Sequence, residues 1–151
     1  MRADAPMLRV LIVDDNRDAA DSLARIIKLW GHDAWASYDG PSGLAAAIFY
    51  RPDVVLVDVS LPGMDGFQLV RAIRTQPALR GSLLISVSAH DDADLVTRLY
   101  DCGINEHLPK PINLIALKAL LKRHSGAAQD DPDEPPGSGF LSRPSPASLV
   151  F

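Results

Sequence analysis

The sequence predicts an α/β fold in which helices cover both faces of a five-stranded parallel sheet. Short runs rich in Val, Ile and Leu recur along residues 7–124, as buried strands require. Segments with helical spacing separate these runs, and such alternation is typical of a parallel sheet. The length of 151 residues suits one domain plus an appendage.

The predicted elements follow one another in a repeated strand–helix order. The strands are 8–13, 34–38, 54–57, 83–87 and 106–108, of which 34–38 is weak and 106–108 is short. The helices are 18–30, 42–50, 67–75, 92–102 and 114–123. Gly31 and Gly103 come directly after two of these helices, where a glycine commonly ends a helix.

The composition changes after His124. Residues 125–151 contain five prolines, four acidic residues and one base, so this segment carries a charge of −3 out of the −4 of the chain. We expect 1–6 to be a short N-terminal extension, 7–124 the folded domain, and 125–151 a disordered, acidic tail rich in Pro, Gly and Ser. A short docking motif in Leu149-Val150-Phe151 is the alternative for the end of this tail.

Composition also excludes several function classes. A sequence pI of about 5.4 argues against a nucleic-acid-binding surface. The single cysteine, Cys102, rules out a disulfide framework within the chain and a Cys-rich zinc site. No apolar run approaches the roughly 20 residues that span a bilayer, and no signal-peptide core is visible. We therefore expect a cytoplasmic protein that does not enter the membrane.

Charged and hydroxyl side chains follow four of the predicted strands. Asp14 and Asp15 follow the first strand, Asp58 the third, Ser88 the fourth and Lys110 the last. Ligands of open parallel sheets bind at the carboxyl edge of the strands, so these groups are expected to converge. Clustered carboxylates repel one another, and Mg²⁺ relieves that repulsion. The combination suits phosphoryl transfer with Asp58 as the nucleophile.

Four motifs carry a family resemblance. They are Val13-Asp14-Asp15-Asn16, Val57-Asp58-Val59-Ser60-Leu61-Pro62-Gly63-Met64-Asp65-Gly66, Ser86-Val87-Ser88-Ala89 and Leu108-Pro109-Lys110-Pro111. In this order and spacing they resemble the receiver domain of two-component response regulators, over about residues 7–124. The resemblance implies the flavodoxin-like, doubly wound strand order 2-1-3-4-5.

The resemblance also implies residue roles. Asp58 is the phosphoacceptor, and Mg²⁺ is held by Asp14, Asp15, Asp58 and the backbone carbonyl of Ser60. Lys110 pairs with a phosphoryl oxygen, and Ser88 turns toward the phosphoryl group. The Lys110–Pro111 bond is expected to be cis, and Pro62 and Gly66 are expected to shape the loop after Asp58.

The clearest departure from the family is His107, which stands three residues before the lysine, where Tyr or Phe is common. We interpret it as a partly exposed strand residue, with a rotamer switch that adds pH sensitivity as the alternative. Other ordinary interpretations stay open. Asp14 and Asp15 also suit a helix N-cap, Asp65 suits a turn or cap, and His32 and His124 are expected on the surface.

The expected function is phosphorelay signalling. A sensor histidine kinase or a histidine phosphotransfer protein donates the phosphoryl group, a downstream protein is the target, and water later removes the group. The chain thus catalyses its own phosphorylation and dephosphorylation without being a conventional enzyme. We expect a single-domain regulator without DNA-binding output, either a monomer or a weak phosphorylation-dependent dimer. The alternative is a receiver-like interaction module that is never phosphorylated; a haloacid-dehalogenase-type phosphatase is disfavoured because Asp58-Val59-Ser60 lacks the second acid.

Overall fold

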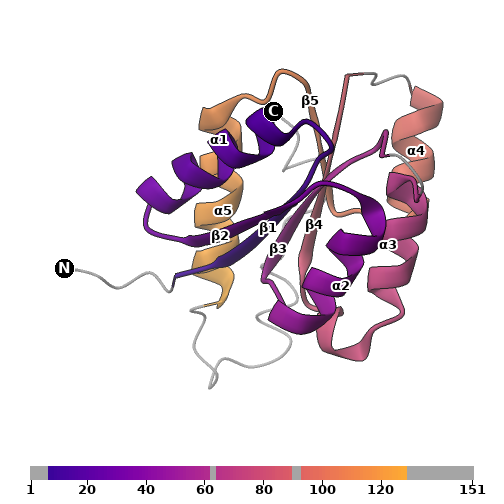
Figure 1. The fold of residues 1–151 in the computed structure, drawn as a ribbon, viewed down its shortest axis with the longest axis horizontal. Coiled ribbons are helices and arrows are strands. Elements are labelled where there is room, and N and C mark those ends of the chain that lie inside the picture. The colour runs from indigo at the N-terminus through magenta and orange to yellow at the C-terminus, as the bar shows by residue number, and fades with distance from the viewer. Residues whose placement is uncertain (1–6, 62–63, 90–92, 129–151) are drawn as a thin grey trace.

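The computed structural model describes residues 7–61, 64–89 and 93–128, and these residues form the predicted α/β fold (Figure 1). One sheet contains five parallel strands in the order β2-β1-β3-β4-β5. The strands are β1 Arg9–Val13, β2 Asp33–Ser37, β3 Val54–Asp58, β4 Leu83–Ser88 and β5 Glu106–Pro109. The chain passes outward from β1 to β2 and then returns to β3 on the other side of β1. The switch point of the sheet therefore lies between β1 and β3.

Helices cover both faces of this sheet. They are α1 Arg17–Leu29, α2 Gly40–Tyr50, α3 Gly66–Arg74, α4 Ala93–Cys102 and α5 Leu114–Ala128, with a 3-10 turn at Pro77–Leu79. Helices α1 and α5 lie on one face, and α2, α3 and α4 lie on the other (Figure 1). Alternate residues of β1 explain this division, because Val10 and Ile12 face the first layer and Leu11 and Val13 the second.

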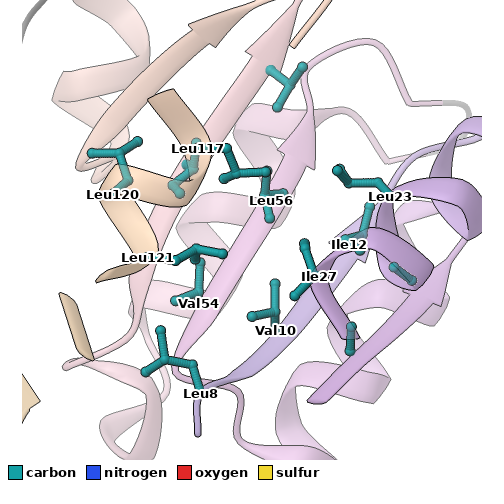
Figure 2. Packing of buried hydrophobic residues seen from close by; sticks show 14 of the residues in the cluster. Leu8, Val10, Ile12, Leu23, Ile27, Val54, Leu56, Leu117, Leu120 and Leu121 are labelled. Atoms are coloured by element: carbon teal, nitrogen blue, oxygen red, sulfur yellow. The ribbon is translucent and has the colours of Figure 1, made fainter. Parts of the chain in front are cut away.

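Each face has its own apolar core. Figure 2 shows the core under α1 and α5, where Val54 and Leu56 of β3 lie among Leu117 and Leu121 of α5. Leu8, just before β1, belongs to the same cluster. The other core joins β3 to α3 and α4 through residues such as Val57, Val70 and Leu99. Two apolar layers thus hold the strand ends in fixed positions, and the candidate site is built on those ends.

Helix caps decide two of the open interpretations. Helix α1 is capped by Asn16, whose side chain accepts a hydrogen bond from the Ala19 amide at 3.0 Å, so the Asp14–Asp15 cap is wrong. Asp65 does cap α3, and it forms a reciprocal capping box with Gln68. Asp14 and Asp15 are therefore available for another role.

The structure departs from the predictions at several places. Helix α5 ends at Ala128 rather than Arg123, so it enters the segment assigned to the tail, and Ser125 there is only 2% exposed. Residues 125–128 are Ser, Gly, Ala and Ala, a composition that does not predict the end of a helix. The 3-10 turn at Pro77–Leu79 was not predicted. The predictions for 1–6, Pro62 and 129–151 lie outside the described residues.

The two histidines expected on the surface are half-buried, so that expectation is wrong. The Nδ1 atom of His32 accepts a hydrogen bond from the Leu8 amide at 3.1 Å, and His124 lies beside Asp53. Burial lowers the pKa of both imidazoles. In the described part of the chain, none of the helices combines the length and apolarity needed to cross a membrane.

Candidate functional site

Three carboxylates gather at the carboxyl edge of the sheet, beside the switch point. Asp58 is the last residue of β3 and is only 7% exposed. Asp14, directly after β1, is half-buried, whereas Asp15 is exposed. One carboxylate oxygen from each residue lies within 4.8 Å of the other two. The structure therefore brings together the acidic residues that the sequence singled out.

Lys110, directly after β5, reaches this cluster from the side of the sheet formed by β3, β4 and β5. Its Nζ lies 3.2 Å from Asp58 Oδ2 and 3.4 Å from Asp14 Oδ2. The Lys110 amide donates to the Ser88 carbonyl at 2.8 Å, which fixes the backbone after β5 against the end of β4. The Lys110–Pro111 peptide bond is cis, as the resemblance implied.

Burial and neighbouring charges set the protonation of this site. Burial raises the pKa of Asp14, the Asn16 amide that donates to its Oδ1 at 3.0 Å lowers it, and the Asp58 charge raises it again, for a net rise. Burial would lower the pKa of Lys110, but the charges of Asp58 and Asp14 outweigh burial and raise it. By formal charge the three carboxylates and the ammonium of Lys110 together carry −2, which a divalent cation would neutralise.

The loop after Asp58 is folded back onto that residue. The Ser60 amide donates to Asp58 Oδ1 at 3.0 Å, and the Gly66 amide donates to the Val59 carbonyl at 3.1 Å. A Cβ atom at Gly66 would lie 2.7 Å from Val59 Cα and 3.0 Å from the Asp58 carbonyl oxygen. Such distances require backbone to move, so glycine is needed where α3 starts. The role predicted for Gly66 in shaping the loop fits this close approach.

Ser88 and His107 occupy the adjacent strands. Ser88 ends β4 and is 3% exposed, and the Val59 amide donates to the carbonyl of its neighbour Val87 at 3.1 Å. His107 in β5 is half-buried, with Nδ1 2.7 Å from the hydroxyl oxygen of the fully buried Ser86. Sequence reasoning assigned no role to Ser86. The available signal was its place opposite His107 in the β4–β5 register, which requires the strand pairing to be known.

A groove beside the carboxylates was also missed. It has a volume of about 510 Å³ and runs between α1 and the segment after β5. Its apolar lining comes from Ala19, Leu23, Ile26 and Ile112, and Asp14 and Lys110 border it. The spacing of 19, 23 and 26 was visible in the sequence, but it indicates only a helix face and does not separate core from groove.

Comparisons with known proteins agree with this geometry. A family model described as the response regulator receiver domain matches residues 10–122. Response regulator MprA of Mycobacterium sp. (strain KMS) is 33% identical over 139 residues, which cover 89% of this chain and 57% of that protein. The chain therefore spans little more than half the length of this curated relative.

Solved structures give the same result. Chemotaxis protein CheY4 of Vibrio cholerae superposes with a TM-score of 0.74 at 28% identity, covering 78% of this chain and 98% of that chain. The signal receiver domain of a signal transduction histidine kinase from Syntrophus aciditrophicus also has a TM-score of 0.74, at 27% identity. That match covers 85% of this chain and 97% of the other.

Proposed function

We propose, since this chain belongs to the response regulator receiver domain family of two-component signalling, that it accepts a phosphoryl group on Asp58 and thereby changes its protein contacts. The observation that supports this most directly is the position of the Asp58 carboxylate. It lies at the switch point, 7% exposed, with Lys110 Nζ at 3.2 Å and the oxygens of two further carboxylates within 4.8 Å.

The residues of the chain suit nucleophilic attack on phosphorus. In the proposed step an Asp58 oxygen forms a bond to phosphorus as the bond from phosphorus to the donor nitrogen breaks. The Ser60 amide holds Asp58 Oδ1 at 3.0 Å and so orients the carboxylate. The Lys110 ammonium is placed to stabilise negative charge on the phosphoryl oxygens. A fixed positive charge at that position lowers the energy of the transition state.

The donor set also fits Mg²⁺. This ion prefers oxygen ligands and usually joins one or two carboxylates to a phosphate group. Asp14, Asp15, Asp58 and the Ser60 carbonyl would hold it, and the cluster charge of −2 matches a divalent cation. When bound, the ion would supply positive charge that offsets the repulsion between these carboxylates and an incoming phosphoryl group.

The proposed phosphoryl donor is a phosphohistidine on a sensor histidine kinase or a histidine phosphotransfer protein. The groove between α1 and the segment after β5 supports a docking place for this donor. It is apolar along Leu23, Ile26 and Ile112, and its lining includes Asp14 and Lys110, of which Lys110 lies 3.2 Å from Asp58. Amphipathic helices commonly bind in apolar grooves of this kind.

The proposed switch runs through β4 and β5. Ser88 turns toward the new phosphoryl oxygens, and the segment after β4 follows it, which biases an equilibrium between two conformations. His107 lies on β5 with Nδ1 2.7 Å from Ser86, within reach of the same movement. The output is a contact with a downstream protein, as monomer or as weak phosphorylation-dependent dimer, without nucleic-acid or membrane binding.

Intact mass after incubation with acetyl phosphate tests the chemistry. We expect one phosphoryl group to be added in the presence of Mg²⁺, and none in Asp58→Asn. Asp53→Asn is the matched control at the opposite edge of the sheet, and it should be phosphorylated like the wild type. Addition of the group to Asp58→Asn would contradict the assignment. No addition to the wild type, together with no binding of beryllofluoride, would favour the interaction module that is never phosphorylated.

A further inference from the structure

A second groove lies at the amino edge of the sheet, far from the phosphoacceptor. It has a volume of about 820 Å³ and is lined by Arg9, Ala45, Ile48, Phe49, Tyr50 and Arg51. Phe49 is 77% exposed and Ile48 is 46% exposed, so two large apolar side chains of α2 face solvent next to each other in sequence. Scattered exposed apolar residues are normal, but a contiguous set in a groove marks a binding surface.

The aromatic side chains of this groove are already ordered against one another. Tyr50 stacks on Trp35 of β2 with ring centroids 4.6 Å apart, and Phe49 meets Tyr50 edge to face at 4.9 Å. The Arg9 guanidinium lies 5.7 Å from the Trp35 ring centroid. A rigid aromatic surface costs little conformational entropy when it binds, which favours docking.

The charges of the groove indicate what fits it. Its described lining contains two arginines, Arg9 and Arg51, and no acidic side chain. The occupant that matches is a segment with acidic and large apolar residues. Residues 129–151 have this composition: they contain Asp130, Asp131, Asp133 and Glu134, and farther along Phe140-Leu141 and Leu149-Val150-Phe151.

The route of the chain leads to the same place. Helix α5 ends at Ala128, and its His124 lies beside Asp53, whose carboxylate accepts a hydrogen bond from the Arg9 amide at 2.8 Å. Residue 129 thus follows a helix that ends at the edge where β1 begins (Figure 1). An extended chain covers about 3.3 Å per residue, so residues 130–134 stay within about 20 Å of Ala128 and residues 140–151 reach any part of the domain.

We propose that residues 129–151 dock on the α2 groove of their own chain, with the acidic run next to Arg9 and Arg51 and the apolar residues on Ile48, Phe49 and Tyr50. This interaction goes beyond phosphoryl acceptance and leaves that site free, because the groove lies at the amino edge and Asp58 at the carboxyl edge. The alternative occupants, a second copy of the chain or a separate protein, are distinguished by the test.

The test uses the full chain with a nitroxide at Ser148→Cys in a Cys102→Ala background, and NMR of the backbone amides. We expect paramagnetic loss of the amide signals of Arg9 and of residues 48–51, with the signals around Asp58 retained. Loss of no signals, or loss centred elsewhere on the domain, would overturn the proposal. So would loss that appears only when labelled and isotope-enriched copies are mixed, because that result indicates a second copy as the occupant.

A matched pair of variants separates the groove from general surface effects. Phe49→Ser with Arg51→Glu should restore the lost amide signals, whereas Leu29→Ser with Lys28→Glu should not. Leu29 is 81% exposed on α1, so the control removes an equally exposed apolar residue and reverses one charge away from the groove. Signal loss that persists in the groove variant would overturn the proposal. Acetyl phosphate should phosphorylate both variants like the wild type, so failure here is distinguishable from failure of the proposed function.

Discussion

The two edges of the sheet use charge in opposite ways. At the carboxyl edge, Asp14 and Asp58 share the single ammonium of Lys110 at 3.4 and 3.2 Å, and an excess of negative charge remains. At the amino edge, the Asp53 carboxylate accepts a hydrogen bond from the Arg9 amide at 2.8 Å, and the Arg9 guanidinium lies 5.7 Å from the Trp35 ring centroid.

This difference suits the carboxyl edge to the proposed chemistry and the amino edge to a structural role. Half-buried carboxylates that lack enough cations lower stability, and a fold tolerates them where the charge is used for binding or chemistry. The amino edge instead joins strand starts to helix ends, and there a carboxylate such as that of Asp53 accepts a hydrogen bond from a backbone amide. A substitution at the carboxyl edge should therefore mainly change phosphoryl acceptance. A substitution at the amino edge should mainly change stability or docking.

Lys110→Ala is expected to have the largest effect. Removing the ammonium 3.2 Å from Asp58 should slow phosphoryl acceptance from acetyl phosphate about a hundredfold, the usual size for a lost electrostatic partner. Some acceptance should remain, but the phosphorylated variant should no longer respond in its partner contacts. Intact mass followed over time measures the rate of phosphoryl acceptance. Partner affinity of the phosphorylated and unphosphorylated variant measures the response in partner contacts.

Lys118→Ala is the control for this comparison. Lys118 lies on α5 with Nζ 5.6 Å from the Trp30 ring centroid, and it has no place in the proposed site. It removes the same charge and should leave the rate unchanged. Equal slowing in the two variants would show that net charge, and not the position of Lys110, controls the reaction.

Gly66→Ala should come next, because it forces the backbone at the carboxyl edge to move. The added Cβ would lie 2.7 Å from Val59 Cα, and overpacking of this kind typically costs about 1–3 kcal/mol. We expect the free energy of unfolding in urea to fall by about 2 kcal/mol. In Gly81→Ala the new Cβ meets no atom within 4 Å, so that variant should be nearly neutral. A neutral Gly66→Ala would contradict the close approach.

The two grooves provide a third comparison. Ile26→Asp places a charge in the apolar lining beside the carboxylates and should reduce phosphoryl transfer from a phosphohistidine protein about tenfold, or about 1.4 kcal/mol. Acetyl phosphate should react normally, since it needs no docking surface. Ile48→Asp makes the same change in the α2 groove and should leave transfer unaffected. Equal loss in both variants would remove the distinction between the grooves.

How far the sequence predicts this molecule depends on whether a feature is local. The strand ends, and with them Asp14, Asp58 and Lys110, followed from apolar runs and from the direction of the chain. Asn16 was not identified as the N-cap of α1, and the Asp14–Asp15 cap was left open as an alternative, because all three residues suit a cap and only the helix position decides among them. Asp65 was correctly interpreted as a turn or cap residue, because only one predicted helix begins close to it.

Features that depend on tertiary contact were not predictable. The last turn of α5 is made of residues typical of a linker, yet Ser125 in it is only 2% exposed, and a linear pattern does not show such burial. His32 and His124 looked like surface residues because their partners, Leu8 and Asp53, are distant in the chain. The grooves combine side chains from separate elements, so a linear pattern does not reveal them.

The smallest expected effect is a change in how stability at the amino edge depends on pH. Burial lowers the pKa of His124 in the folded state, and Asp53 offsets this only in part. Below the unfolded pKa of about 6.5 the unfolded chain binds the proton more readily, so this contribution to stability is present above pH 6.5 and is lost as pH falls. In His124→Asn the free energy of unfolding should therefore fall less steeply between pH 7 and pH 5.5 than in the wild type.

Other groups do not obscure this comparison. Burial raises the pKa of Glu106, so its protonation stabilises the fold as pH falls, which is the opposite sign, and it is common to both proteins. The difference between the two urea-denaturation series therefore isolates His124. Parallel pH profiles would mean that this imidazole is protonated as easily in the folded chain as in the unfolded one. The amino edge would then be open to solvent at His124, and its role in closing the sheet beside Asp53 would have to be abandoned.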